Sequence, residues 1–189
     1  MSIPKLRQYQ AHRNTRHAQG LLELICCCDD LWGIDGALKQ RIAEQALTIL
    51  RQSRPVGSSR AHWLYVRGKA LSITEHHRAA IKSFRASLKM DPTRIAGYLS
   101  LAWCLKRIDR VDQSILVLNK ALKRSPQHAK IRFNQACYLS LAGQPHLAAT
   151  ELAIALELDP SLRWKVSTER DFDPIRHHPA FDAALQVIV

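Results

Sequence analysis

The chain lacks long apolar runs and an even number of cysteines, and it shows no pattern of a secretory signal; from each absence we expect that a class of protein is excluded. Although 47% of the 189 residues are hydrophobic, no run of 18 or more is apolar, so we expect no membrane span. No basic start is followed by an apolar segment and a cleavage site, which predicts no secretory signal. Five cysteines, three of them consecutive (Cys26, Cys27 and Cys28), cannot form a standard disulfide framework, so we expect a reducing cytoplasm.

The sequence also has none of the motifs that carry chemistry in enzymes and metalloproteins. Gly68-Lys69-Ala70 follows no glycine-rich turn and is therefore no phosphate-binding loop. The pairs His76-His77 and His177-His178 are adjacent, and neighbours on a helix point about 100° apart, so neither pair shares a metal. Cys26–Cys28 could bind a soft metal or carry a lipid, but an incidental role is the favoured interpretation. We expect no enzyme activity, no cofactor and no metal.

A 34-residue period is the main feature that the sequence does have. Pro92, Pro126 and Pro160 recur at that spacing and divide the chain into the blocks 61–94, 95–128 and 129–162. Small and large apolar residues recur with the prolines. These matching sets are Gly68, Ala102 and Ala136; Leu71, Leu105 and Leu139; Ala80, Ser114 and Ala148; Phe84, Leu118 and Leu152. A period of this length is typical of stacked structural repeats.

Each block contains two stripes of apolar residues at helical spacing, separated by a short turn. In the third block Gly143 supplies a helix stop and Pro145 suits the first turn of the next helix. We therefore expect helix pairs at about 61–74 and 77–90, 95–108 and 111–124, and 129–142 and 145–158. Gly68 is expected to face Ala80 where the first pair crosses, so that the backbones approach closely.

The blocks resemble the tetratricopeptide repeat family, whose pattern of small, bulky and proline positions all three match without insertion or deletion. The departures lie in first helices: Leu64, Arg67, Arg132 and Gln135 replace the usual aromatic and leucine. The resemblance, which is to a bacterial-type array with a C-terminal capping tail, implies an all-α fold. That fold is a right-handed superhelical solenoid of helix–turn–helix repeats, and it implies a non-catalytic scaffold.

The regions that flank the repeats are predicted to be atypical caps. Residues 1–60 are expected to hold N-terminal helices, either as a simple cap or as the remainder of an eroded repeat, with Leu38, Ile42, Ala46, Ile49 and Leu50 on one face. A short apolar segment spans 19–31, and we expect the stretch before it to be frayed or disordered. Residues 163–189 are expected to cap the last repeat, with Ser161 as a helix N-cap. The predicted plug residues are Phe172, Ile175, Phe181 and Leu185.

Positive charge is concentrated in the middle of the chain. Residues 61–128 carry 13 Lys and Arg against 4 Asp and Glu, whereas residues 1–60 carry 9 against 5 and residues 129–189 carry 6 against 7. An acidic partner would therefore bind near the first two repeats, unless the charge is simply a solvated surface. The alternative function is that of an RNA-binding helical-repeat factor that uses the basic 61–128 region. No basic arm or regular base-stacking pattern supports it.

The resemblance places the partner-binding site in the concave groove, which the family lines with first-helix side chains. Carried over to this chain, the groove residues are Tyr65, Lys69, Leu99, Trp103, Lys106, Arg107, Lys130, Phe133, Asn134 and Cys137. Aromatic anchors among cations suit a protein or peptide segment with large apolar and some acidic side chains. Some of the aromatic side chains, Tyr65, Trp103 and Phe133, could instead pack against neighbouring helices.

One subclass of the family binds the C-terminal carboxylate of chaperones with Lys and Asn at fixed positions. Tyr65 and Lys69 stand at two of those positions here, and Lys130 and Asn134 keep only part of the pattern. The sequence therefore predicts a protein-binding adaptor of another kind.

Overall fold

The computed structural model describes residues 3–52 and 54–186, and the regular structure within these ranges is entirely helical. This confirms the predicted all-α class. The chain divides into two compact units, Met1–Cys104 and Leu105–Val189, and each is described by itself. Within the described ranges no helix is both long enough and apolar enough to cross a membrane.

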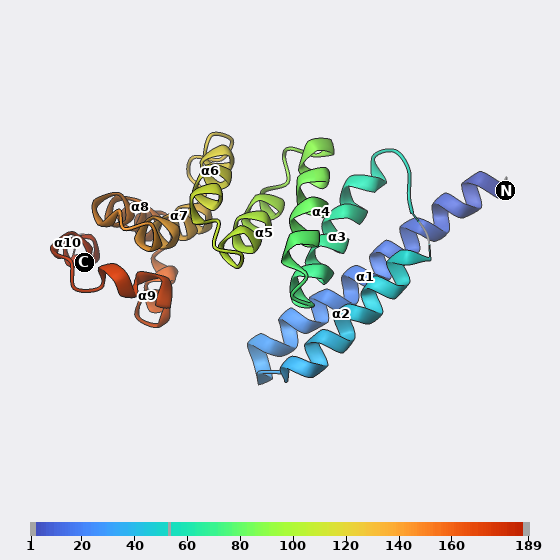
Figure 1. Ribbon diagram of the computed structural model, residues 1–189, viewed down its shortest axis with the longest axis horizontal. Coiled ribbons are helices and arrows are strands. Elements are labelled where there is room, and N and C mark those ends of the chain that lie inside the picture. The colour runs from blue at the N-terminus through green and yellow to red at the C-terminus, as the bar shows by residue number, and fades with distance from the viewer. Residues whose placement is uncertain (1–2, 53, 187–189) are drawn as a thin grey trace. The chain divides into compact units, whose positions relative to one another are not determined.

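The first unit contains two helical hairpins and the beginning of a fifth helix (Figure 1). The helices are α1 (Ile3–Trp32), α2 (Gly36–Arg51), α3 (Ser59–Ile73), α4 (His77–Met90) and α5 (Ile95–Lys106). Helices α1 and α2 pack along each other, as do α3 and α4, and α3 also contacts α1 and α2. The bounds of α3 and α4 agree closely with those predicted from the repeat.

Helix α1 corrects the expectation that the residues before 19 are frayed. It runs unbroken for 30 residues. Its buried face is made largely of small and polar side chains, Ala11, Asn14, Thr15 and Ala18, which continue into Leu22 and Ile25. Thr15 donates its hydroxyl to the carbonyl of Ala11 (2.8 Å) and so needs no partner outside the helix. The prediction failed because it took large apolar residues as the sign of a buried helix face, whereas this face is made largely of small residues.

Helix α2 occupies nearly the predicted range, but its buried face is rotated from the predicted one. Ala43, Ala46, Leu47 and Leu50 are buried, whereas Leu38 is 39% exposed. The helix begins at Gly36 because the Asp35 carboxylate accepts hydrogen bonds from the backbone N–H groups of Ala37 and Leu38 (2.9 and 3.2 Å).

Gly68 and Phe84 approach each other closely where α3 and α4 pack together. A Cβ built on Gly68 would lie 2.6 Å from the Phe84 ring, so the ring occupies the space that a side chain would need. The partner expected from the sequence was Ala80. Ala80 is buried too, but the Phe84 ring is what excludes a larger residue at position 68.

The second unit contains the rest of the second predicted repeat, the third, and the C-terminal helices. Its elements are α6 (Val111–Leu122), α7 (Ala129–Leu141), α8 (Pro145–Leu158), η1 (Pro160–Leu162), α9 (Arg163–Thr168), η2 (Arg170–Ile175) and α10 (Pro179–Gln186). Segment η2 packs on α7, and α10 packs on α8. Phe172, Ile175 and Phe181 are buried, as the plug hypothesis expects, and Leu185 is half-buried.

The N-cap after Pro160 differs from the predicted one. Asp159, not Ser161, is the capping residue: its carboxylate accepts hydrogen bonds from the backbone N–H (3.1 Å) and hydroxyl (2.6 Å) of Ser161. The division of the chain into segments 1–60, 61–162 and 163–189 stays a prediction. The boundary between the two compact units is a different one and falls inside α5.

The first helix of each block ends in the same way. Glu75, Asp109 and Gly143, 34 residues apart, have φ values of 60°, 58° and 68°. In each case the following N–H reaches back to a leucine carbonyl at 2.9 Å, from His76 to Leu71, from Arg110 to Leu105 and from Gln144 to Leu139. This is the Schellman ending that stops a helix with one left-handed residue.

Candidate functional site

The ten predicted groove residues are divided between the two units. Tyr65, Lys69, Leu99 and Trp103 belong to the first unit, and Lys106, Arg107, Lys130, Phe133, Asn134 and Cys137 belong to the second.

In the first unit Trp103 is the most exposed aromatic side chain of the predicted set. It is 40% exposed, and its ring and the His77 imidazole are nearly perpendicular, with centroids 5.5 Å apart. Leu99 lies one helical turn before it on the same face of α5 and is half-buried. An exposed indole held against an imidazole and next to a leucine is a surface that an apolar side chain of a partner can contact.

Tyr65 is more firmly packed than the groove hypothesis requires. It is half-buried, with its ring 6.0 Å from the Phe84 ring and the Arg94 guanidinium 5.1 Å above its face. Arg94 also pairs with Asp91 at 3.0 Å. The tyrosine therefore orders part of the repeat interior while one side stays accessible. Lys69, one turn later on α3, is half-buried as well.

His62 does not add to the positive charge of this region at neutral pH. Its Nε2 atom lies 2.7 Å from the Gln19 side-chain oxygen, and burial, followed by repulsion from Arg94 and His12, lowers the pKa of the imidazole. Lowering the pKa of a histidine favours the neutral ring.

In the second unit the structure corrects two predicted groove residues. Phe133 is only 6% exposed and packs edge-on against Phe172 with ring centroids 5.5 Å apart. Cys137 is 2% exposed, and burial followed by the nearby Glu169 and Asp171 charges raises the pKa of its thiol well above the usual value. Both are covered because η2 lies on α7. The C-terminal cap therefore occupies the surface of α7 that the family pattern assigns to a partner.

The other residues of the second unit are in part held by the protein itself. The Lys106 ammonium pairs with Asp171 at 2.6 Å and lies 5.7 Å from the centre of the Tyr138 ring. The Asn134 amide donates to the carbonyl of Lys130 at 2.7 Å. Arg107 and Lys130 are exposed. Because Asp171 already neutralises the Lys106 ammonium, the charge of Lys106 stabilises the contact with the C-terminal cap and is less available to a partner.

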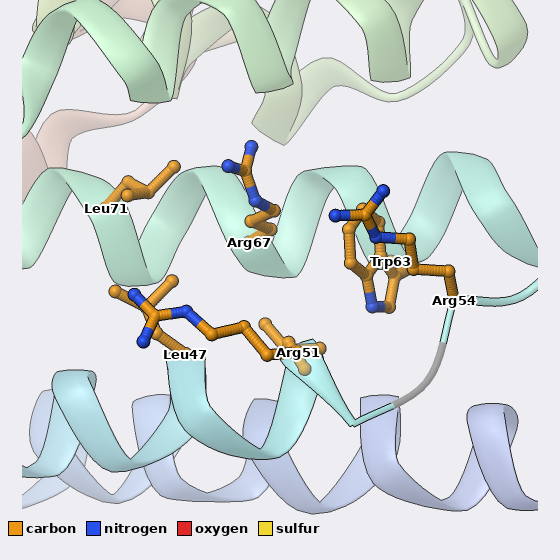
Figure 2. Close-up of a pocket in the computed structure, with 7 residues that line it drawn as sticks. Leu47, Arg51, Arg54, Trp63, Arg67 and Leu71 are labelled. Carbon is orange, nitrogen blue, oxygen red and sulfur yellow. The ribbon is translucent and has the colours of Figure 1, made fainter.

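A cluster of charge that the sequence analysis missed lies between α2 and α3. Arg51, Arg54 and Arg67 line a pocket beside Trp63 (Figure 2). The three arginines come from two helices and the loop between them, so no local motif marks them. A departure from the repeat pattern, Arg67 in place of leucine, was the one signal available.

No side-chain arrangement typical of a metal centre is found within the described ranges, since no three His, Cys, Asp or Glu side chains there could hold an ion together. The buried cysteines are not activated for nucleophilic chemistry either: burial raises the pKa of Cys104 to about 12.

Comparison with known structures supports the same fold. MamA AMB-1 superposes with a TM-score of 0.67 at 18% identity, covering 97% of this chain and 88% of that chain. MamA MSR-1 gives a TM-score of 0.60 at 16% identity, covering 96% and 95%. The Yersinia enterocolitica type III secretion chaperone SycD, in complex with a peptide of the translocator YopD, gives 0.56 at 20% identity, covering 69% and 96%. These likenesses concern the fold alone.

Sequence comparison identifies a family for the middle of the chain. None of the curated proteins compared with the chain matches it. The tetratricopeptide repeat family matches residues 61–94 and 95–128, the first two of the three blocks defined by the proline period. Helix α4 lies within the first match, as does α3 apart from its first two residues, and α5 and α6 lie within the second. Residues 61–128 of this chain are therefore two tetratricopeptide repeats.

Proposed function

We propose that this protein is a non-catalytic scaffold that binds a segment of another protein on the face of the first unit formed by α3 and α5. The observation that carries the proposal is the exposed Trp103 indole on the first helix of a repeat, one turn after Leu99. Tryptophan is one of the residue types enriched among the side chains that anchor protein interfaces.

The positive charge around this face favours a bound segment that carries an acidic side chain. Lys69 on α3 is half-buried, and the basic repeat region carries few carboxylates to compensate it. A segment with a large apolar side chain for Trp103 and an acidic one for Lys69 would satisfy both features. The SycD structure, which contains a bound translocator peptide, is a precedent for peptide binding on a similar fold.

The proposal is tested by selecting binders from a displayed library of peptides that combine acidic and apolar residues, followed by affinity measurement on wild-type and variant protein. Trp103→Ala should weaken the selected peptides by at least about tenfold, because truncating a central aromatic anchor costs roughly 2 kcal/mol or more. Trp164→Ala is the matched control, since this tryptophan of α9 is 68% exposed and lies outside the proposed surface.

Unfolding measurements separate binding from folding. Leu105, which is buried, gives the core reference: Leu105→Ala should cost about 2–5 kcal/mol, and Trp103→Ala much less. Equal losses of stability for the two variants would show that Trp103 is a core residue. Equal peptide affinities for Trp103→Ala and Trp164→Ala would contradict the proposed site.

A further inference from the structure

A small pocket in the first unit has the character of an anion site. Its wall is formed by the leucines Leu47, Leu50 and Leu71 and by the Trp63 indole, and its rim by Arg51, Arg54 and Arg67. The cavity volume is about 140 Å³. Figure 2 shows the three arginine side chains that line the pocket, with Arg51 and Arg54 from the carboxyl end of α2 and the loop after it and Arg67 from α3.

The three positive charges are not compensated. No lining residue is acidic, and no ion pair joins any of the three arginines to a carboxylate in the described ranges. Burial, followed by repulsion from Arg54 and Arg51, lowers the pKa of the Arg67 guanidinium. The carboxyl end of α2 contributes a partial negative charge of only about half a unit. A net charge of more than two units therefore remains for a ligand to neutralise.

Two contacts hold the pocket in shape before a ligand arrives. The Arg67 guanidinium donates to the hydroxyl of Ser83 on α4 at 2.6 Å, and that hydroxyl also donates to the carbonyl of Ala79 at 3.1 Å. The same guanidinium lies 6.0 Å from the centre of the Trp63 ring. A guanidinium fixed from two sides loses little freedom when it binds an anion.

The Trp63 indole supplies a second, independent observation. Its side chain is 7% exposed, and its Nε1 atom is buried with no hydrogen-bond partner. In Figure 2 this nitrogen lies on the edge of the ring that faces α2. A buried donor without an acceptor is unfavourable, and buried indole N–H groups usually find one. An oxyanion in the pocket would bring an acceptor to this side of the indole.

We propose that this pocket binds a phosphoryl group, carried by a phosphorylated side chain of a protein or present as free phosphate. A phosphate monoester has a charge of about −1.5 to −2 at pH 7 and three acceptor oxygens, which matches three guanidiniums better than a carboxylate with one charge. The leucine wall suits the apolar carbon atoms next to a phosphorylated oxygen. The site is separate from Trp103 and does not depend on the scaffold proposal.

The test is calorimetric titration with inorganic phosphate at constant ionic strength, with acetate as the reference anion. The double variant Arg51→Gln/Arg54→Gln should raise the phosphate Kd by at least about tenfold, since charge-assisted hydrogen bonds to both arginines are lost. Both residues are exposed, so the fold should remain, as circular dichroism would verify. The control Arg41→Gln/Arg78→Gln removes the same charge from exposed positions of α2 and α4 outside the pocket.

A second titration identifies the source of the group. A peptide with phosphoserine next to leucine is compared with its serine and glutamate versions. Tighter binding than inorganic phosphate, lost in the Arg51/Arg54 variant, assigns the pocket to a phosphoprotein; equal or weaker binding assigns it to free phosphate. The proposal is overturned if acetate binds as well as phosphate, if both double variants lose phosphate equally, or if only an RNA oligonucleotide binds. Trp103→Ala should leave phosphate affinity unchanged.

Discussion

Arg132, a residue that breaks the repeat pattern, has specific polar partners in this protein. Arg132 stands where the family has a large aromatic residue, yet it donates to the Pro126 carbonyl at 2.8 Å and pairs with Glu151 at 2.7 Å. Tyr98, the conforming residue of the preceding repeat, donates to the equivalent Pro92 carbonyl at 3.2 Å. At this position a polar residue thus makes the same kind of hydrogen bond to the proline carbonyl as the aromatic residue does in the preceding repeat.

The close approach of Gly68 to Phe84 gives a residue-scale prediction. Gly68→Ala should lower the free energy of unfolding by about 1–3 kcal/mol, because the new Cβ overlaps a fully buried ring. Gly20→Ala is the matched control: Gly20 lies within α1 with nothing within 4 Å of the new Cβ, so the same change should stabilise by about 0.5–1 kcal/mol. Chemical denaturation measures both.

A double-mutant cycle assigns the cause of the Gly68→Ala effect. In a Phe84→Leu background the smaller side chain leaves room for the Cβ, so the cost of Gly68→Ala should shrink by at least about 0.5 kcal/mol. An unchanged cost in that background would mean that the ring is not what excludes a side chain at position 68.

At the scale of elements, the sequence predicted the helices whose turn residues and apolar stripes recur every 34 residues. It missed features that lie outside this period. The 34-residue period fixed the bounds of α4 and α8 because turn residues and apolar stripes agreed at both ends. Helix α1 was missed in its first half because Ala11, Asn14 and Thr15 form its buried face. The covering of Phe133 by η2 was missed because it depends on where a segment about 40 residues away packs.

The shared helix ending predicts that substitutions at two equivalent positions, Gly143 and Asp109, change the free energy of unfolding in opposite directions. Gly143→Ala should destabilise the protein by about 1–2 kcal/mol, since a Cβ is strained at a φ of 68°. Asp109→Gly should be neutral or stabilise by up to about 1 kcal/mol, because relief of the same strain exceeds or offsets the added freedom of the unfolded chain. Thermal unfolding of the two variants measures the difference.

Comparison of the Gly143 and Asp109 variants also shows whether backbone strain causes the changes in stability. Neither Gly143 nor Asp109 is buried, and a Cβ on Gly143 would meet nothing within 4 Å, so packing does not enter. Destabilisation by both substitutions would mean that the Asp109 side chain itself stabilises the turn and that conformation is not the deciding factor.

At the scale of the whole molecule, the net charge of +12 makes some affinity for any polyanion unavoidable. That affinity is the only basis for the RNA-binding alternative, which the comparisons do not support. A phosphodiester carries one negative charge per nucleotide, so it does not match the phosphoryl pocket as a monoester does. Non-specific attraction by charge is therefore distinguished from specific RNA binding by the salt dependence of the affinity and by which residues the binding requires.

We expect a single-stranded RNA oligonucleotide to bind weakly at low salt and not measurably at physiological salt. Each phosphate contact lowers log K by about 0.7 per log unit of salt, so a few contacts suffice for this loss. The pair Arg78→Glu/Lys82→Glu on α4 and the pair Lys165→Glu/Arg170→Glu in the second unit should weaken low-salt binding to a similar degree, because all four side chains are exposed. Fluorescence anisotropy at several salt concentrations measures this. Binding that stays tight at physiological salt and is lost only with the α4 pair would instead establish residues 61–128 as an RNA-binding surface, since non-specific attraction has no reason to prefer one pair of exposed charges over the other.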